Sequence, residues 1–375
     1  MVFNKVKRVV MRGAEVLEHT VPAMFFKSDM SSWEDCYRYL NDIHKDVRSS
    51  AIRNKTPDDE ANYKYDVSVI MTTYNRADLV ERCVKSILSN VPKDDKYKVE
   101  CIFINDGSKD NTEEILNRYK AYPHVTVINQ ENKGVSNARN TGIDTSEARY
   151  VLFVDDDDLL MEGAVEKLLK ASEKGEYDII EGGTMRVLRD GTERKEDVVE
   201  SGEIEHPLGV LKGFSWGKLL RRNIFDRIIF PEKYWFEDSI NSALIHGDHI
   251  KAYIIEEPVY KYFLTEGSIT SSLNSPRNID SIYVTMQLLK DRKELNLPFK
   301  QENYEYFLRM VNLTYQRTKK FDTKVRYCIF EINKYLRQEY YKDFKTEKSD
   351  YLKTIEDSLL ENNFKKYVKA CELHV

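Results

Sequence analysis

Between about residues 66 and 154 the chain alternates short apolar runs with amphipathic segments. Each run is rich in apolar and β-branched residues, and the runs lie at 67–71, 99–104, 125–128 and 151–154. The segments that follow the first three runs, at 76–90, 112–122 and 135–145, are longer, and the first has its apolar residues at helical spacing. Short apolar strands that alternate with helices predict a parallel sheet covered on both faces. The expected fold class is α/β, with a doubly wound, mostly parallel sheet.

The regions on either side of this pattern differ from it. Residues 1–62 are helical in patches and end in a polar stretch around Pro57 that suits a linker. The segment from about 165 to 275 is mixed, with glycine-rich breaks, and the chain after Pro276 has a helical pattern. We therefore expect an N-terminal helical extension and linker at 1–62, a catalytic α/β domain at 63–272 and a C-terminal helical domain at 273–375.

Composition narrows the possible classes of protein. The 375 residues carry a net charge of −5 with 32% charged residues, which argues against a generally basic nucleic-acid binder. The five cysteines are scattered and form no CxxC pair, so neither a disulfide framework nor a zinc site is indicated. No apolar run approaches the roughly 20 residues that span a bilayer, and no secretory signal is evident. We expect a protein of the reducing cytoplasm with no nucleic-acid partner.

Two segments are locally basic. Residues 1–12 hold four Lys or Arg and no acid, and residues 309–345 hold ten Lys or Arg against four acids, interleaved with aromatic residues. The simpler interpretation is a solvated helix end and a solvated helix face. The alternative is a peripheral contact with the inner face of an anionic membrane, or with an acidic polymer. The C-terminal helices could also pair with a second copy of the chain.

Polar stretches follow all four predicted strands, at 72–76, 105–108, 132–134 and 155–158. Because ligands in such sheets bind beyond the carboxyl ends of the strands, these stretches predict a common site. The first strand is not followed by GxGxxG or GxxxxGK[ST], which argues against the usual dinucleotide and P-loop sites. Residues 105–114 resemble a calcium loop but lack the glycine that such a loop requires after its third ligand.

The last stretch contains four consecutive carboxylates, Asp155–Asp158. Adjacent unit charges about 4 Å apart repel by roughly 1 kcal/mol in water and about 4 kcal/mol near a protein surface, so something must offset the repulsion. In an extended chain Asp155 and Asp157 face the same side. We expect Asp158 to cap a helix that begins near Leu159. A solvated acidic loop is the alternative interpretation.

Four motifs in order resemble glycosyltransferase family 2, the inverting nucleotide-sugar enzymes of the GT-A fold. They are VSVIMTTYNR from Val67, NDGSKDNT from Asn105, NKGVSNARN from Asn132 and the Asp155-x-Asp157 signature. The resemblance covers about residues 66–272. It implies an enzyme that uses a UDP-sugar donor with Mn²⁺ or Mg²⁺.

The resemblance also implies donor-side roles. In the family the first-strand loop and the second-strand acid hold the nucleoside, a basic residue lies near the nucleotide, and the DxD signature binds donor and metal. The corresponding residues are Thr72, Tyr74, Asp106, Arg139, Asp155, Asp156 and, for the metal, Asp157. A tyrosine ring can cover a base and a carboxylate can accept its imide N–H. For Arg139, an ion pair with a strand-end aspartate is the alternative.

Acceptor-side roles follow from later segments. Glu237-Asp238 resembles the family's acid pair, which makes Asp238 the base that removes the acceptor proton and Glu237 its supporting neighbour. An acid pair that caps a helix is the alternative. FSWGKL from Phe214 matches an acceptor-side segment and supplies Trp216 and Lys218. The segment around Tyr262 and Gly267 resembles one that closes near the diphosphate, which places Lys261 and Ser268 there.

The sequence therefore predicts an inverting hexosyl- or N-acetylhexosaminyltransferase that acts on a glycan or glycolipid, such as a cell-surface polysaccharide, by metal-assisted single displacement. One alternative is a nucleotidyltransferase, although that class normally has a Gly-rich, basic signature after the first strand. Another is a non-catalytic glycan- or lipid-binding protein on the same fold. The presence of Asp155, Asp157 and Asp238 together argues against a decayed site.

Overall fold

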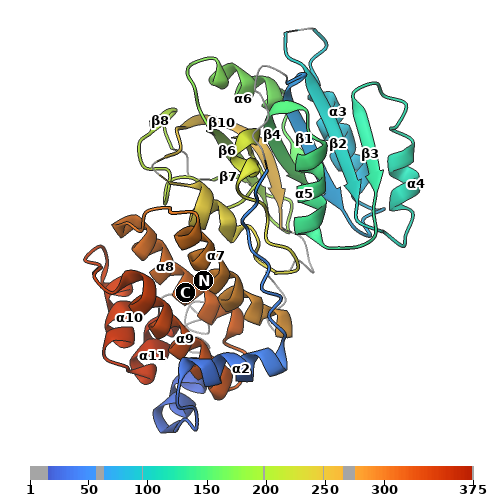
Figure 1. Cartoon of the computed structure of the whole chain (residues 1–375). Coiled ribbons are helices and arrows are strands. Elements are labelled where there is room, and N and C mark those ends of the chain that lie inside the picture. The colour runs from blue at the N-terminus through green and yellow to red at the C-terminus, as the bar shows by residue number, and fades with distance from the viewer. Residues whose placement is uncertain are drawn as a thin grey trace. The chain divides into compact units, whose positions relative to one another are not determined.

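The computed structural model describes residues 16–55, 63–94, 96–196, 199–247, 249–264 and 275–373. The chain divides into two compact units (Figure 1). One holds Ser49–Glu266, and the other holds Met1–Arg48 together with Gly267–Val375. The first is an α/β unit and the second is helical.

The α/β unit begins with four strands that alternate with three helices. These elements are β1 (Tyr65–Thr73), α3 (Val80–Ser89), β2 (Val99–Asn105), α4 (Thr112–Asn117), β3 (Val125–Asn129), α5 (Val135–Thr145) and β4 (Ala148–Asp155). The mixed region adds β5 (Leu159–Leu160), α6 (Ala164–Ser172), β6 (Ile179–Val187), β7 (Glu193–Lys195), β8 (Gly202–Ile204), β9 (Lys218–Arg221) and β10 (Ala252–Phe263). Short 3₁₀ and π segments lie at Arg222–Asp226 and Asn241–Ile245.

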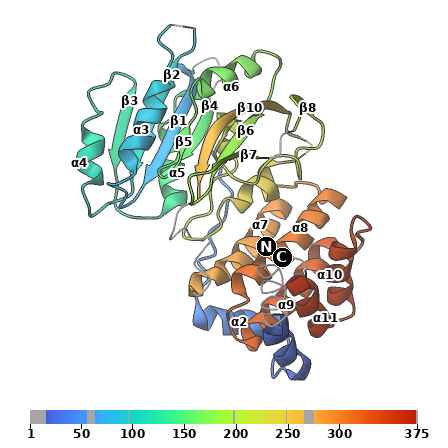
Figure 2. The same cartoon turned by 180° about the vertical axis from the view of Figure 1, so that it is seen from behind.

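These strands form one sheet in the order β3-β2-β1-β4-β9-β6-β10-β5, with β7 on β6 and β8 on β10 (Figure 2). The first four strands are mutually parallel, as is the β6–β10 pair, whereas β9 runs antiparallel between β4 and β6. In the register, Thr72 lies opposite Asp155 and Thr73 lies opposite Asn105. The carboxyl ends of β1, β2 and β4 therefore meet at one edge, as the sequence predicts.

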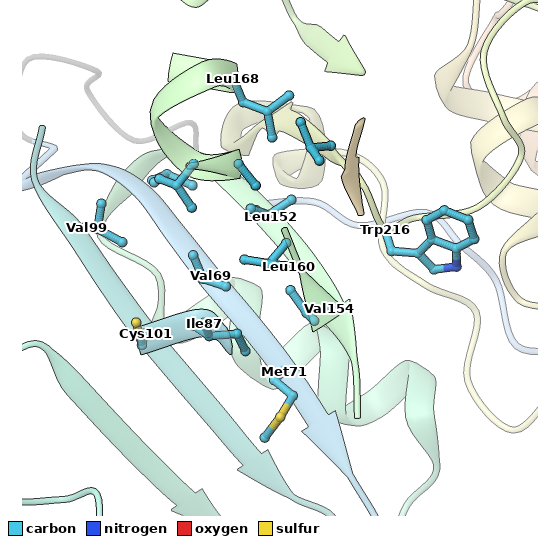
Figure 3. Close-up of a cluster of buried hydrophobic side chains, with 14 of the residues drawn as sticks. Val69, Met71, Ile87, Val99, Cys101, Leu152, Val154, Leu160, Leu168 and Trp216 are labelled. Atoms are coloured by element: carbon cyan, nitrogen blue, oxygen red, sulfur yellow. The ribbon is translucent and has the colours of Figure 1, made fainter. Parts of the chain in front are cut away.

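One face of the sheet packs against α3, α4 and α6 in a continuous hydrophobic cluster. Alternate residues supply it, because successive side chains of a strand point to opposite faces. Figure 3 shows Val69 and Met71 of β1 with Leu152 and Val154 of β4 on this face, and Leu168 of α6 belongs to the same cluster. On the opposite face of the sheet, α5 lies against β1 and β2.

The approach of α5 to the sheet depends on a glycine. A Cβ at Gly142 would lie 2.4 Å from Cγ2 of Ile70, well inside van der Waals contact. Glycine is therefore needed for α5 to lie this close to β1. This close packing places the first turns of α5, including Arg139, beside the carboxyl end of the sheet.

The predicted α/β fold class is confirmed, and the four predicted strands and three predicted helices are present. The helix predicted to begin near Leu159 is wrong, because Leu159–Leu160 form the short strand β5, which pairs with β10. Helix α6 begins only at Ala164, after Gly163. Asp158 consequently caps no helix. Its carboxylate accepts the N–H of Phe263 instead, at 2.8 Å.

The second unit consists of helices. They are α2 (Trp33–Ile43), α7 (Asp280–Glu294), α8 (Gln301–Thr318), α9 (Thr323–Tyr341), α10 (Asp350–Leu360) and α11 (Phe364–Leu373), with a 3₁₀ turn at Pro276–Ile279 and further helical residues at 16–25. The rings of Trp33 and Tyr335 stack at 3.9 Å and join α2 to α9. Among the helices that the structure describes, none is long and apolar enough to cross a membrane.

The basic residues of α8 and α9 are largely engaged within this unit. Arg326 and Arg337 are buried and donate to Thr323, Tyr304 and the carbonyl of Phe344. Lys324 and Lys334 pair with Asp29 and Glu331. This internal pairing favours the simpler interpretation of the 309–345 region, and its predicted membrane and second-copy contacts stay predictions. The basic residues at 1–12 lie outside the described residues.

Candidate active site

The loops that follow β1 and β2 are hydrogen-bonded to each other. The Asn75 amide oxygen accepts the N–H of Lys109 at 2.7 Å, and the hydroxyl of Thr112 accepts the N–H of Arg76 at 2.9 Å. Asn75 has a φ of +53°, a left-handed conformation that asparagine tolerates better than most residues. These bonds hold the loop that carries Tyr74 and that follows Thr72 and Thr73 at the end of β1. Thr72 is nearly buried, whereas the Tyr74 ring is 44% exposed at the strand-end edge.

Asp106 holds the loop that leads into α5. One carboxylate oxygen accepts from Gln130 Nε2 and from the N–H of Lys133, at 2.8 and 2.9 Å. The other accepts the N–H of Gly134 at 2.8 Å. The N–H of Gly134 lies at the start of α5, where the helix dipole favours a negative charge. Asp106 therefore orients α5 in this structure, and its predicted contact with the base stays a prediction.

Arg139 is the centre of the site. Its side chain is only 4% exposed and contacts three acids that come from two distant segments. Nη2 donates to Asp155 Oδ1 at 3.0 Å, and Nη1 donates to Glu237 Oε1 at 2.8 Å and to Asp238 Oδ1 at 3.1 Å. Burial by itself would lower the pKa of Arg139, but the three carboxylates raise it overall. One guanidinium thus brings the end of β4 and the Glu237-Asp238 pair together.

Asp238 is held through one of its two oxygens. Besides Arg139, the hydroxyl of Ser215 donates to Oδ1 at 2.7 Å. Oδ2 accepts no hydrogen bond from any residue within the described ranges. The side chain of Asp238 is 28% exposed and that of Asp155 31%, whereas those of Arg139 and Glu237 are buried, so the two aspartates form the open side of the ion cluster.

The backbone around the acid pair is unusual. Phe236, directly before Glu237, has a φ of +67°, which is rare for a bulky residue and costs free energy. The residues after the pair form a π-helical segment, a form that often occurs at functional sites. Burial, followed by the charge of Asp238, raises the pKa of Glu237 to about 7. The fold therefore tolerates both backbone strain and a buried acid at this position.

The aspartate run at the end of β4 is strongly desolvated. Burial raises the pKa of Asp155 to about 6, of Asp156 to about 7 and of Asp158 to about 9, and their neighbours in the run add to each shift. Arg139 lowers the pKa of Asp155 and so offsets part of its shift. Arg76 Nε lies 3.5 Å from Asp156 Oδ1. The four carboxylates thus have different environments, which the sequence run alone does not reveal.

Asp157 was predicted to bind a divalent metal. Its carboxylate charge raises the pKa of Asp155, Asp156 and Asp158, so it lies close to all three. In the part of the chain that the structure describes, no group of three or more His, Cys, Asp and Glu side chains could hold a metal ion. A site that shares its ion with diphosphate oxygens needs fewer protein ligands. The concentration of carboxylate oxygens at this strand end fits Mg²⁺ or Mn²⁺.

The predicted acceptor-side residues, Trp216 and Lys218, lie just before and at the start of β9, and both are buried. Trp216 stacks between Phe214 and Tyr260, at 4.9 and 4.5 Å between ring centres, and Phe214 is the exposed ring of this stack, at 43%. Lys218 has no exposed surface, and its ammonium pairs with the buried Glu181 at 2.5 Å. Burial lowers the pKa of Lys218. A direct contact between Lys218 and an acceptor would require this ion pair to break, so its predicted role stays untested.

The predicted diphosphate-side residues are only partly covered by the structure. Lys261 lies on β10 and pairs with Glu193 at 2.8 Å, an interaction that a bound anion could replace. Ser268 lies outside the described residues.

Several site residues were not predicted from the sequence. The hydroxyl of Tyr260 accepts the N–H of Asp155 at 3.0 Å, and Arg82 donates to the carbonyl of Asp157. Ser215 and Asn241 contact the acid pair. The sequence holds a signal for both Ser215 and Asn241. Ser215 lies inside the matched segment FSWGKL, and Asn241 follows Asp238 by three residues, about one helical turn.

The chain was compared with known proteins. Residues 68–230 match the family model described as glycosyl transferase family 2. One relative, the poly(ribitol-phosphate) β-N-acetylglucosaminyltransferase TarP of Staphylococcus aureus, is 32% identical over 223 residues, which are 55% of this chain and 64% of TarP. Another, the uncharacterized glycosyltransferase EpsJ of Bacillus subtilis, is 31% identical over 222 residues, which are 54% of this chain and 62% of EpsJ. The chain thus spans less than two thirds of the length of either relative.

Among solved structures, residues 1–349 of S. aureus TarS in complex with UDP-GlcNAc are similar to this chain. The TM-score is 0.64 at 17% sequence identity, and the alignment covers 82% of this chain and 90% of the TarS chain. At this identity the similarity concerns the fold, which is of the GT-A type with additional helices.

Proposed function

Residues 68–230 of this chain belong to glycosyltransferase family 2, and we propose that the chain transfers a sugar from a UDP-sugar to a hydroxyl group of a glycan or glycolipid acceptor. The observation that carries the proposal is the contact of Arg139 with both the strand-end Asp155 and the Glu237-Asp238 pair. This contact brings the expected donor side and the expected base, about 80 residues apart in sequence, into one site.

The donor side is built from the loops after β1, β2 and β4. The exposed ring of Tyr74 can cover the base, and Asp106, which accepts three hydrogen bonds, has about one acceptor site left for the imide N–H. We propose that Asp155 and Asp156 orient the donor sugar and ribose. TarP is named for N-acetylglucosaminyl transfer and the TarS structure contains UDP-GlcNAc, so UDP-GlcNAc is the first donor to test.

Asp157, together with diphosphate oxygens, would hold the divalent metal, which stabilises the negative charge that develops on the departing UDP. Two cations of the chain already lie at the aspartate run: Arg139 pairs with Asp155, and Arg76 Nε lies 3.5 Å from Asp156 Oδ1. We propose that a divalent metal at Asp157 adds to this compensation.

The acceptor side is built around Asp238. In the proposed single displacement, the acceptor oxygen forms a bond to the anomeric carbon while the bond from that carbon to the UDP oxygen breaks. The acceptor proton passes to Asp238 Oδ2, the oxygen that makes no hydrogen bond within the described ranges. Arg139 keeps Asp238 and Glu237 in place and partly neutralises them. Attack from the face opposite UDP inverts the configuration.

The test is UDP release from UDP-GlcNAc in the presence of Mn²⁺, first with water as acceptor. Asp238→Asn should lower the rate by about 100-fold or more, because a general base contributes about 10²–10⁴ in rate. The affinity for UDP, measured by calorimetry, should change less than about threefold. Asp144→Asn, at the surface end of α5, is the matched control and should keep the wild-type rate.

Other outcomes would change the assignment. A large loss of UDP affinity in Asp238→Asn would move Asp238 to the donor site, and an unchanged rate would remove its role as base. Binding of UDP-GlcNAc with no turnover would favour the glycan-binding alternative. Release of pyrophosphate from a sugar phosphate and UTP would favour the nucleotidyltransferase alternative.

A further inference from the structure

We propose that Ser215 and Asn241 form a relay of hydrogen bonds that positions the base, so that Ser215 directs its proton to one oxygen of Asp238 and leaves the other oxygen to accept the acceptor proton. This inference rests on the proposed function, because it assumes that Asp238 is the base. It assigns positioning roles to two residues that contact neither donor nor acceptor in the proposed mechanism.

The orientation of the Asn241 amide follows from its neighbours. Its Nδ2 lies 3.0 Å from the carbonyl oxygen of Asp238 and 3.2 Å from that of Gly213. Carbonyl oxygens only accept hydrogen bonds, so the amide nitrogen and not the amide oxygen must point toward them. The same nitrogen lies 3.0 Å from Ser215 Oγ. Asn241 is completely buried, which fixes this arrangement.

The direction of the Ser215 proton follows in turn. Ser215 is also completely buried, and its hydroxyl has one hydrogen. The Asn241 amide nitrogen can only donate and shares its two hydrogens among three oxygens, one of them Ser215 Oγ, so the single hydroxyl hydrogen of Ser215 donates to Asp238 Oδ1, 2.7 Å away. A donor that points at a carboxylate oxygen favours the charged form of the acid and holds its plane.

Two donors on the same oxygen produce an asymmetric carboxylate. Arg139 Nη1, on α5, and Ser215 Oγ, before β9, both donate to Oδ1 of Asp238. The remaining charged groups around Asp238 are Glu237, Asp155 on β4 and Lys218 on β9, and each acts on it through charge. Because both donors lie on Oδ1, Oδ2 is the more basic of the two oxygens. Without Ser215, the carboxylate could rotate about χ2 toward Arg139 alone.

The main experiment compares Ser215→Ala with Ser146→Ala in the full chain, using UDP release from UDP-GlcNAc with Mn²⁺ as the assay. Ser146 is buried like Ser215 and bonds to the Ser68 hydroxyl at 2.5 Å, but it does not contact the acid pair. Ser215→Ala should lower kcat by about 10- to 100-fold with KM changed less than about threefold. In the pH–kcat profile of Ser215→Ala, the fall in activity at low pH should begin at a higher pH than in the wild type. Ser146→Ala should keep the wild-type profile.

A second variant tests the direction of the relay. In Asn241→Asp, a carboxylate oxygen can accept the Ser215 proton and draw it away from Asp238, so kcat should fall as in Ser215→Ala. The pair Ser215→Ala and Asp238→Asn should also be non-additive: once Asp238 has been replaced, removal of the hydroxyl should lower the rate less than about twofold further. Thermal unfolding of each variant separates a loss of positioning from a loss of fold.

Different results would contradict the relay and the proposed function. If Asp238→Asn is inactive but Ser215→Ala keeps the wild-type kcat and pH profile, the relay is wrong and the base assignment stands. The relay is also wrong if Ser215→Ala changes only the midpoint of thermal unfolding, to the same extent as Ser146→Ala. If Asp238→Asn keeps its activity, the base assignment fails and the relay fails with it, whereas a wild-type chain that binds UDP-GlcNAc without turnover would contradict the proposed function itself.

Discussion

Arg139 Nη2 donates to Asp155 Oδ1 at 3.0 Å, and this ion pair ties α5 to the carboxyl end of β4. The same guanidinium donates to Glu237 and Asp238 from its other nitrogen. The fold thus surrounds one buried cation with three acids. Sequence reasoning left two interpretations of Arg139 open, a nucleotide neighbour and a partner of a strand-end aspartate, and the structure has the second arrangement.

The first prediction concerns this cluster. Arg139→Met should lower the free energy of unfolding by about 3–5 kcal/mol at pH 8, because three acids would lose their buried counter-charge. At pH 5 the loss should be smaller. The pKa values of Asp155 and Glu237, about 6 and 7, are already raised and would rise further without the arginine, so both acids would be protonated in the folded state.

Urea unfolding at pH 5 and pH 8 measures this difference. Arg53→Met, which breaks the pair between Arg53 and the half-exposed Asp144, is the control and should cost about 1 kcal/mol or less at both pH values. Equal losses for the Arg139 variant at both pH values would contradict the assigned role of its acidic neighbours.

The second prediction concerns the metal. In the wild type, Mn²⁺ should raise the affinity for UDP by about tenfold or more, because in the proposed site Asp157 and the diphosphate would hold the ion together. In Asp157→Asn, Mn²⁺ should change this affinity by less than about twofold. Calorimetry of UDP with and without Mn²⁺ is the measurement, and Asp190→Asn, in an exposed turn, is the control. A full Mn²⁺ effect in Asp157→Asn would assign the metal to another carboxylate.

The third prediction concerns Asp158, whose side chain is buried and whose pKa is raised to about 9 by desolvation and the neighbouring aspartates. The folded chain keeps this proton at neutral pH, whereas the unfolded chain releases it near pH 4. The free energy of unfolding should therefore fall as pH rises between about 4 and 9, by about 1.4 kcal/mol per pH unit from this group.

Asp158→Asn removes that contribution and keeps an oxygen that can accept the N–H of Phe263. Its stability should fall less steeply with pH than that of the wild type, so the variant should gain relative stability from pH 6 to pH 8. Chemical denaturation across this range measures the slopes. Parallel curves for the two proteins would mean that Asp158 is already ionised in the fold.

The fourth prediction concerns the buried pair of Lys218 and Glu181. Lys218→Met should cost about 3–5 kcal/mol, because it leaves an uncompensated buried carboxylate. Adding Glu181→Gln should recover part of this loss, since a neutral amide oxygen can still accept the backbone N–H of Lys212. Urea unfolding of the two single variants and the double variant forms the cycle. If the single losses simply add, the two residues do not stabilise each other.

Much of the α/β fold could be predicted from the sequence because its signals are local. The apolar runs at 67–71, 99–104 and 151–154 correspond to β1, β2 and β4, and helical spacing at 76–90 indicated α3. The pattern was ambiguous at Leu159-Leu160, where two apolar residues after an acidic run suit either a helix or a strand. Pairing with β10, some 100 residues later, decided for a strand.

In the candidate site, too, the sequence predicts local features but not the contacts between distant residues. The polar strand ends and the Glu237-Asp238 pair could be identified by residue type and order. The aspartate run could not be divided by role, because its members differ in burial and neighbours, not in sequence: Asp155 contacts Arg139, Asp156 lies near Arg76, and Asp158 bonds to β10. The matched segment predicts Lys218 as an acceptor-side cation, whereas the packing of the fold places it in a buried ion pair with Glu181.

The sequence by itself determined the alternating strands and helices, the polar strand ends and the residue types of a donor site, because these properties depend on neighbours within a few positions along the chain. Only the tertiary structure decided that Arg139 joins residues 16, 98 and 99 positions away, and that Ser215 and Asn241 contact the proposed base. The physical reason is that ion pairs, desolvation and hydrogen-bond direction depend on which side chains meet in space.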